Sequence, residues 1–250
     1  MSLLDMTTPA VRRVMTLFYV VDTSGSMKGS KIGTVNSAME EAVLRDLPAI
    51  SEENDDAEIK AAIMQFSSGC SWITPASAPV GVGDLVWNDL EAGGLTDFGA
   101  ACLELESKLS RSAFLKSDTG CYAPVILLLS DGGPTDDWEA GLEKLQKNNW
   151  FKAAIKIAIA IGDSADREVL ARFTGSPEAV ADAGDKSTLK KLIRRVSVRA
   201  SQFQSRSRSA GTSEEDPSAE AAGLVQEIQS DLGEEPAAAP SAEDSGWEQW

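Results

Sequence analysis

Three largely apolar runs constrain the fold of this chain more than any other feature. They cover residues 14–21, 125–129 and 153–161. Runs of this kind lack an alternating polar face, so each is suited to a strand buried on both sides of a sheet. Stretches with helical spacing lie between them, and alternating strands and helices form a mainly parallel sheet. We therefore predict an α/β, doubly wound fold with helices on both faces.

The remaining elements follow from shorter patterns. A helix is expected to begin at Ser30 as its N-cap and to stop near Asp46, ahead of Pro48. The runs 59–66 and 70–75 are separated by only three residues, which favours a hairpin and hence one antiparallel edge strand. Further helices are predicted over 97–109, 138–145, 166–173 and 186–203, and a weaker strand over 179–183.

Charge divides the chain into two parts. The 250 residues include 23 Lys and Arg and 39 Asp and Glu, giving a net charge of −16. Residues 204–250 hold 11 of these acidic residues but only 2 of the basic ones, and are rich in Ala, Ser and Pro. Such a composition buries too little apolar surface to fold alone. We expect an N-terminal extension over 1–13, one domain over 14–203 and an acidic, disordered tail over 204–250.

Composition excludes several classes of function. A net charge of −16 argues against a nucleic-acid partner, because phosphate contacts need a positive surface. The chain has no histidine, which removes Ser-His-Asp and Cys-His catalysis and histidine-ligated metals. Cys70, Cys102 and Cys121 form no CxxC pair, so we expect reduced, mostly buried thiols. No apolar stretch approaches the roughly 20 residues that span a bilayer, and we expect a cytoplasmic protein without a membrane partner.

Polar side chains gather in three loops next to the expected strand ends. Asp22, Ser24 and Ser26 directly follow the first buried strand, Thr96 precedes a helix, and Asp131 follows the run 125–129. The binding crevice of an open α/β sheet lies outside the carboxyl ends of its strands. Two carboxylates with several hydroxyls suit a hard cation such as Mg²⁺. That cation would remain short of negative charge and would attract an acidic group from a partner.

The spacing Asp22-x-Ser24-x-Ser26, with Thr96 and Asp131, resembles the metal-ion-dependent adhesion site of von Willebrand factor type A domains. The resemblance covers about residues 14–203 and implies the Rossmann-like fold of that family. It also implies that Asp22, Ser24 and Ser26 hold Mg²⁺ or Mn²⁺ directly. By the same resemblance, Thr96 binds directly or through water, and Asp131 acts through water.

Two stretches narrow the resemblance within the family. Residues 19–27 and 128–136 resemble the bacterial tellurium-resistance, TerY-like branch. Members of that branch are associated with a Ser/Thr protein kinase and a PP2C-type phosphatase in stress-response gene clusters, which makes these two enzymes the implied partners. Some relatives carry a cysteine-rich metal-binding module after the domain, where this chain has its acidic tail. Functions that depend on that module are therefore not implied here.

Three classes of function remain open. The first is a non-enzymatic interaction module whose metal captures an Asp or Glu of a protein partner. The second, by analogy with other bacterial relatives, is an adaptor subunit of an AAA+ ATPase complex. The third is a Mg²⁺-dependent phosphohydrolase with Asp22 as nucleophile. It is the least favoured, because Ser24 stands where such an enzyme needs an acid–base aspartate.

Other charged residues have a structural interpretation beside a functional one. Asp97, Asp136 and Asp137 are better explained as helix N-caps than as support for the metal, and Ser130 as a strand end. The basic run over 186–199 is read as a solvated helix face, with docking of an acidic partner or of the chain's own tail as the alternative. Within the tail, residues 223–233 have helical apolar spacing that would suit folding on a partner. A separate hypothesis is that the tail carboxylates occupy the chain's own metal site.

Overall fold

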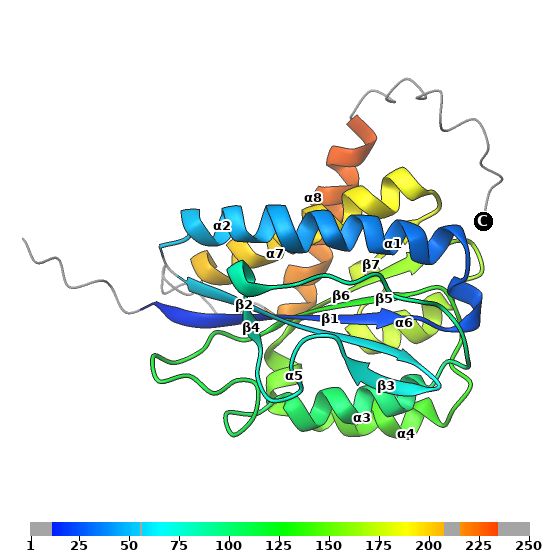
Figure 1. Cartoon of the computed structure of the whole chain (residues 1–250), viewed down its shortest axis with the longest axis horizontal. Coiled ribbons are helices and arrows are strands. Elements are labelled where there is room, and N and C mark those ends of the chain that lie inside the picture. Colours follow the sequence, from blue (N-terminus) through cyan, green and yellow to red (C-terminus); the bar gives the residue numbers. More distant parts are fainter. Residues whose placement is uncertain (1–11, 56, 208–215, 235–250) are drawn as a thin grey trace, which may run out of the picture.

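A single sheet runs through the centre of the computed structural model, which describes residues 12–55, 57–207 and 216–234. Within these residues the sheet has seven strands in the order β3-β2-β1-β5-β6-β7, and β4 also pairs with β2 (Figure 1). All pairings between β2, β1, β5, β6 and β7 are parallel, whereas β3 and the short β4 run antiparallel to β2. The predicted fold class is therefore confirmed. The strands are β1 (Arg13–Asp22), β2 (Ala57–Ser67), β3 (Gly69–Trp72), β4 (Val80–Gly81), β5 (Val125–Ser130), β6 (Ile155–Ile161) and β7 (Val180–Ala183).

Helices cover both faces of this sheet (Figure 1). Side chains alternate along β1, so that Leu17 and Tyr19 enter one buried cluster while Phe18 and Val20 enter the other. The first cluster is completed by α1 (Ser30–Glu41), α2 (Leu47–Glu53), α7 (Lys186–Ser207) and α8 (Pro217–Glu234). The second is completed by α3 (Phe98–Lys108), α4 (Trp138–Lys147), α5 (Asn149–Ala153) and α6 (Arg167–Thr174). No helix in the described ranges is long and apolar enough to cross a membrane.

The first helical segment runs past its predicted end. The chain leaves α1 through a π-helical turn, Ala42–Asp46, and continues directly into α2, which contains Pro48. The amide of Leu47 bonds to the carbonyl of Ala42, five residues back, instead of four. This wider turn relieves the clash of a proline ring with the preceding carbonyls, and Pro48 sits in the first turn of α2, where its missing N–H costs nothing. The prediction of a stop near Asp46 is wrong for this reason.

The predicted disordered tail is wrong for residues 217–234. These residues form α8, which packs against α7, β6, β7 and the 3₁₀ turn Pro177–Ala179. Its apolar spacing therefore serves the chain's own core, with Ala221, Leu224, Val225 and Ile228 buried. Trp247 and Trp250 of the expected tail and most of the expected extension 1–13 lie outside the described residues, although β1 already includes Arg13.

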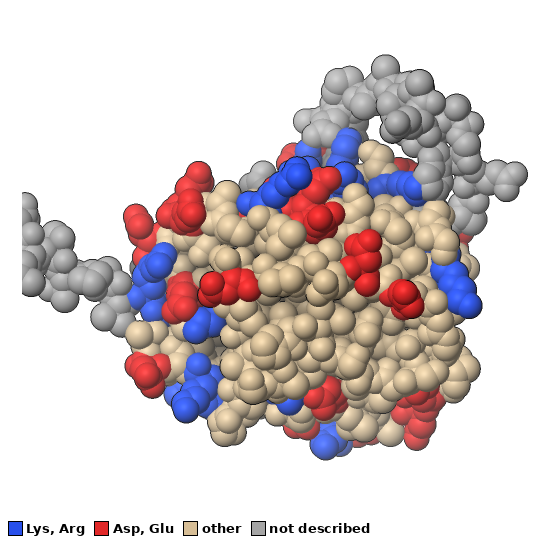
Figure 2. Space-filling view, viewed as in Figure 1, with Lys and Arg blue, Asp and Glu red and all other residues tan. Residues whose placement is uncertain are grey.

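The basic run on α7 is a partly solvated helix face, as expected, and its cations form ion pairs with neighbouring elements. Arg194 Nε lies 2.6 Å from Asp46 Oδ2, and Lys190 pairs with Glu41 at the end of α1. Arg195 Nη1 lies 3.6 Å from Asp231 Oδ2 of α8, a contact with the chain's own tail of the kind named as the alternative. Figure 2 accordingly shows acidic and basic side chains interspersed over this face.

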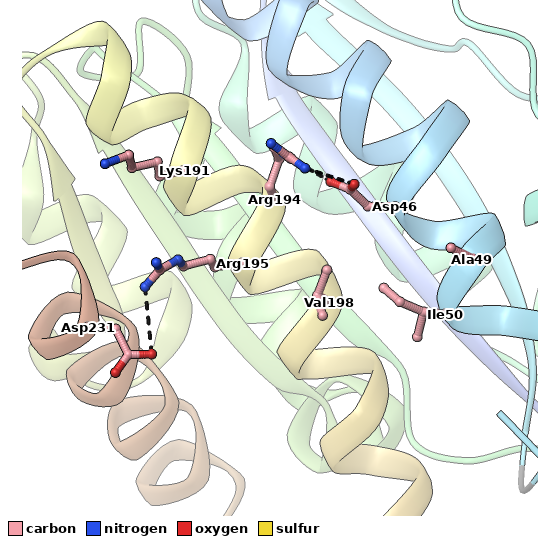
Figure 3. A pocket seen from close by; sticks show the side chains of 8 residues that line it. All are labelled: Asp46, Ala49, Ile50, Lys191, Arg194, Arg195, Val198 and Asp231. Carbon is pink, nitrogen blue, oxygen red and sulfur yellow. Dashed lines mark hydrogen bonds and ion pairs between the residues drawn. The ribbon is translucent and has the colours of Figure 1, made fainter. Parts of the chain in front are cut away.

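These ion pairs border a hollow of about 650 Å³ between α2, α7 and α8 (Figure 3). Its floor is apolar, with Ala49, Ile50 and Val198, and its rim carries both signs of charge. Because Arg194 faces Asp46 and Arg195 faces Asp231 across this rim, these two cations are neutralised within the fold. The pairing of these two arginines leaves both signs of charge mixed along the rim.

All three cysteines are free thiols, as predicted. Cys102 and Cys121 are buried and Cys70 is half-buried. Burial raises the pKa of the Cys70 and Cys102 thiols, and nearby carboxylates act in the same direction. Both thiols are therefore protonated at neutral pH and poorly reactive.

Truncation of the buried face of α8 tests whether this helix belongs to the folded domain. Ile228→Ala should lower the free energy of unfolding by about 2–4 kcal/mol, because Ile228 is 1% exposed and its removal leaves a cavity. Urea unfolding measures the change. Gln226→Ala, on the exposed side of the same helix, should change stability by less than about 0.5 kcal/mol. Equal stability of the Ile228 variant and the wild type would contradict the packing of α8.

Candidate metal centre

Three loops meet at the carboxyl edge of β1 and β5. These strands are parallel neighbours, with Val21 opposite Leu129, so Asp22 and Ser130 end them side by side. The strand order also changes direction here, because β2 lies on one side of β1 and β5, β6 and β7 lie on the other. Ligands of open α/β sheets bind at such a switch point. The topology thus brings the first and third predicted loops together.

Asp22 is fully buried at the end of β1. Its Oδ1 accepts the N–H of Ser24 at 2.8 Å, and its Oδ2 accepts the hydroxyl of Ser130 at 2.6 Å. Burial raises the pKa of Asp22, and the negative charge of Asp131 adds to this, whereas the hydrogen bonds from Ser130 and Ser24 lower it. The ionised carboxylate is therefore short of compensating positive charge, which a bound cation would supply.

Ser24, Ser26 and Asp131 form a continuous hydrogen-bonded chain. The two serine hydroxyl oxygens lie 2.9 Å apart, and Ser26 Oγ donates to Asp131 Oδ1 at 2.7 Å. Ser24 and Asp131 are each 1% exposed, whereas Ser26 is exposed. Together with Asp22, four of the five predicted residues are joined by hydrogen bonds, and Ser26 marks the side that faces solvent.

Thr96 lies on the second loop, which packs against the first. Backbone hydrogen bonds join the two loops, from Gly25 N to Gly94 O at 3.1 Å and from Gly93 N to Thr23 O at 2.8 Å. Thr96 is 6% exposed, and its backbone N–H donates a hydrogen bond to the hydroxyl oxygen of Thr135, on the third loop, at 2.9 Å. Among the described residues, no hydrogen bond joins its side chain to the other four. The structure therefore places Thr96 on the adjoining loop, outside the bonded set.

The close approach of the loops depends on glycine. A Cβ on Gly25 would lie 3.2 Å from the carbonyl oxygen of Gly94. Gly94 has a φ of +83°, and a Cβ there would lie 2.7 Å from Ser68 Oγ. Any larger residue at Gly94 would be strained both by its backbone conformation and by this contact. Gly25 thus permits the approach of the first loop to the second, and Gly94 permits the approach of the second loop to Ser68.

The donor set fits a hard divalent cation. Every predicted ligand offers oxygen, from two carboxylates and three hydroxyls, and Mg²⁺ and Mn²⁺ prefer such donors. The described part of the chain contains no group of three or more His, Cys, Asp or Glu residues placed to hold a metal. A thiolate or purely carboxylate centre is therefore not formed there, and hydroxyl oxygens must make up the difference.

Two residues beside the site were not predicted to take part. Lys31, in the first turn of α1, places its Nζ 2.5 Å from Asp131 Oδ2. Ser130 orients Asp22 and does more than end its strand. The Ser130 hydroxyl next to Asp131 can be seen in the sequence, whereas the approach of Lys31 depends on how α1 packs in the fold.

The three aspartates expected to cap helices behave differently from one another. Asp136 accepts the N–H groups of Gly99 and Ala100, each at 3.0 Å, and so caps α3 instead of the helix that follows it. Asp97 stands at the N-cap of α3 but accepts the N–H of Gly69 at 2.7 Å. Asp137 stands at the N-cap of α4 without a side-chain cap bond. Side-chain capping by position alone is therefore wrong for Asp97 and Asp137.

A buried central sheet with oxygen donors at its switch point defines a class of α/β domains that bind ligands through a metal. Comparison with known families matches residues 17–195 to the von Willebrand factor type A domain. The chain belongs to this family of metal-dependent protein-interaction modules. No curated protein sequence matches it.

Solved structures share the fold. A von Willebrand factor type A protein from Catenulispora acidiphila superimposes with a TM-score of 0.54 at 16% identity, covering 76% of this chain and 43% of its own. The ArnB paralog VWA2 from Sulfolobus acidocaldarius gives 0.55 at 19% identity, covering 73% and 45%. Proximal thread matrix protein 1 from the mussel byssus, with a zinc-occupied MIDAS motif, gives 0.54 at 17% identity, covering 75% and 48%. The chain thus spans less than half the length of each of these proteins.

Replacement of Asp136 tests the cap that joins the third loop to α3. Asp136→Ala should lower the free energy of unfolding by about 1–2 kcal/mol, because two amide groups at the start of α3 lose their acceptor. Denaturant unfolding measures the loss. The matched control is Asp137→Ala, which removes a neighbouring carboxylate that makes no cap bond and should cost less than about 0.5 kcal/mol. Equal effects of the two variants would rule out the cap.

Proposed function

We propose that this chain is a metal-dependent protein-interaction module that binds Mg²⁺ or Mn²⁺ through Asp22, Ser24, Ser26, Thr96 and Asp131. The observation that carries the proposal is the hydrogen-bonded set of four oxygen-bearing residues at the switch point of the sheet. The zinc-occupied MIDAS motif of the mussel protein supports a divalent cation in a fold of this kind. The all-oxygen donors favour Mg²⁺ or Mn²⁺ over zinc, which prefers nitrogen and sulfur.

Each residue has a defined task in this proposal. Asp22 supplies buried negative charge, and Ser130 fixes the direction of its carboxylate. Ser24 and Ser26 contribute hydroxyl oxygens and are held in place by each other and by Asp131. When bound, the cation provides an electrophilic centre for a carboxylate ligand. An Asp or Glu of the partner approaches from the side of Ser26, the exposed member of the set.

The proposal does not include catalysis. A phosphohydrolase that used Asp22 as nucleophile would need an acid–base group close to it. Ser24 occupies the position two residues on, and its hydroxyl is engaged with Ser26. Neither serine transfers protons readily at neutral pH. The absence of turnover on a generic phosphoester, with Mg²⁺ present, is the outcome expected of a binding module.

The setting of the module is a narrower proposal. The likeness of residues 19–27 and 128–136 to the TerY-like branch supports a bacterial, cytoplasmic tellurium-resistance or stress-response system. A Ser/Thr kinase and a PP2C-type phosphatase would then be the partners, and an AAA+ ATPase is the alternative. Both alternatives use the same surface, so the identity of the captured protein separates them.

Metal binding is tested directly by titration calorimetry. The wild type should bind Mn²⁺ and Mg²⁺, and Asp22→Ala should abolish binding, because it removes the buried charge of the site. Asp137→Ala serves as the matched control, since this exposed carboxylate at the same edge of the sheet has no place among the five residues. Binding by the Asp22 variant with wild-type affinity would refute the assignment.

Partner capture tests the functional half of the proposal. Affinity purification on the wild-type chain should recover its partner in Mg²⁺, lose it in EDTA and recover it again when Mg²⁺ is restored. The Asp22→Ala chain should capture nothing above background in either buffer. Mass spectrometry then identifies a kinase and a phosphatase or an ATPase. If the wild type in EDTA and the Asp22 variant both capture as much partner as the wild type in Mg²⁺, the interaction does not use the metal.

A further inference from the structure

Lys31 brings a second positive group to the proposed metal site. Its Nζ lies 2.5 Å from Asp131 Oδ2, while Ser26 Oγ occupies Asp131 Oδ1 at 2.7 Å. The Lys31 side chain is 13% exposed and that of Asp131 is fully buried. Both oxygens of Asp131 are therefore engaged, one by a hydroxyl of the site and the other by a tethered ammonium group.

We propose that Lys31 is a built-in competitor of the divalent cation for Asp131, and that it keeps metal affinity low until an acidic partner arrives. This inference rests on the proposed function of the same site. The Lys31 ammonium neutralises the carboxylate that the metal must share. It also repels a divalent ion over a separation shorter than the screening length of about 8 Å in physiological salt. Burial strengthens this effect, because the local dielectric is lower than that of water.

A purely supporting role for Lys31 is less consistent with the contacts. Ser26 already fixes the orientation of Asp131 through Oδ1, and Ser24 fixes Ser26 in turn. Lysine presents a compact charge on a flexible four-carbon stem, so its head is able to turn away toward solvent while α1 stays in place. A cation that competes with the metal must be able to move away from Asp131, whereas a residue that only supports Asp131 would be better served by a rigid side chain.

Charge balance links this competition to the partner. Asp22 and Asp131 carry two negative charges and Lys31 carries one positive charge, so a divalent cation would leave the group with an excess of one positive charge. A partner carboxylate cancels that excess. Metal binding and partner binding must then strengthen each other by the same factor, because such coupling is reciprocal. With Lys31 present, the metal-loaded site would therefore attract an acidic partner more strongly than a site that held only Asp22, Asp131 and the cation.

The test compares Lys31→Met with Lys31→Arg and with the matched control Lys28→Met. Lys28 is an exposed lysine three residues earlier that has no ion pair to Asp131. Titration calorimetry with Mn²⁺ should show about a tenfold or greater decrease in Kd for Lys31→Met, and little change for Lys31→Arg or Lys28→Met. Melting in EDTA should show a drop of about 3 °C or more for Lys31→Met, since buried Asp131 loses its cation, and less than about 1 °C for Lys28→Met.

Three results would overturn the inference, and they differ from failure of the metal function. Weaker Mn²⁺ binding by Lys31→Met would show that Lys31 supports Asp131. Equal binding by Lys31→Met and the wild type would show that the ammonium does not compete. An unchanged melting temperature of Lys31→Met in EDTA would show that the pair is not formed in solution. Absence of Mn²⁺ binding in every variant, with the melting drop in EDTA intact, would instead remove the metal function and the competition built on it.

Discussion

The parallel pairing of β1 with β5 is the interaction on which the rest of the structure depends. Its register sets Val21 opposite Leu129 and so brings Asp22 within 2.6 Å of the Ser130 hydroxyl. A slip of one residue would turn Asp22 toward the opposite face of the sheet, because side chains alternate along a strand. Register is held by two apolar clusters, one on each face, because a slip would place each side chain of β1 in the opposite cluster, where it does not fit. The geometry of a polar site is thus determined by apolar packing.

Much of this arrangement was predictable because it is local or periodic. Apolar runs identify the central strands, and polar residues that directly follow such a strand lie at the carboxyl edge of the sheet, where ligands bind. Two features escaped prediction because they depend on long-range packing. The helical spacing over 223–233 is visible in the sequence, but the acidic average over 204–250 gives no sign that this helix packs on the chain's own core. That packing needs only four buried residues, Ala221, Leu224, Val225 and Ile228. The π-helical turn before Pro48 arises where α1 must continue against α7, which local helix-stop rules do not consider.

The site itself divides in the same way. Asp22, Ser24 and Ser26 lie within five residues, so one short loop brings them together and sequence spacing is enough to find them. Asp131 joins them from more than a hundred residues away, and only the β1–β5 pairing makes that contact. Lys31 reaches Asp131 from a helix whose rotation about its axis is set by packing. Spacing alone contains no information about that rotation, which is why this lysine could not be assigned beforehand.

The position of α1 therefore decides what charge the site contains. Its inner face packs into the core through Val35 and Met39, both fully buried, and these contacts fix the rotation that points Lys31 toward Asp131. At its other end, Glu41 pairs with Lys190 of α7, and Asp46 pairs with Arg194 of the same helix. Exposed ion pairs of this kind contribute little individually, about 0–1 kcal/mol, so they adjust a placement that the core already determines. A lysine held at a buried aspartate by such packing is a structural part of the site, and its charge belongs in any account of what the site binds.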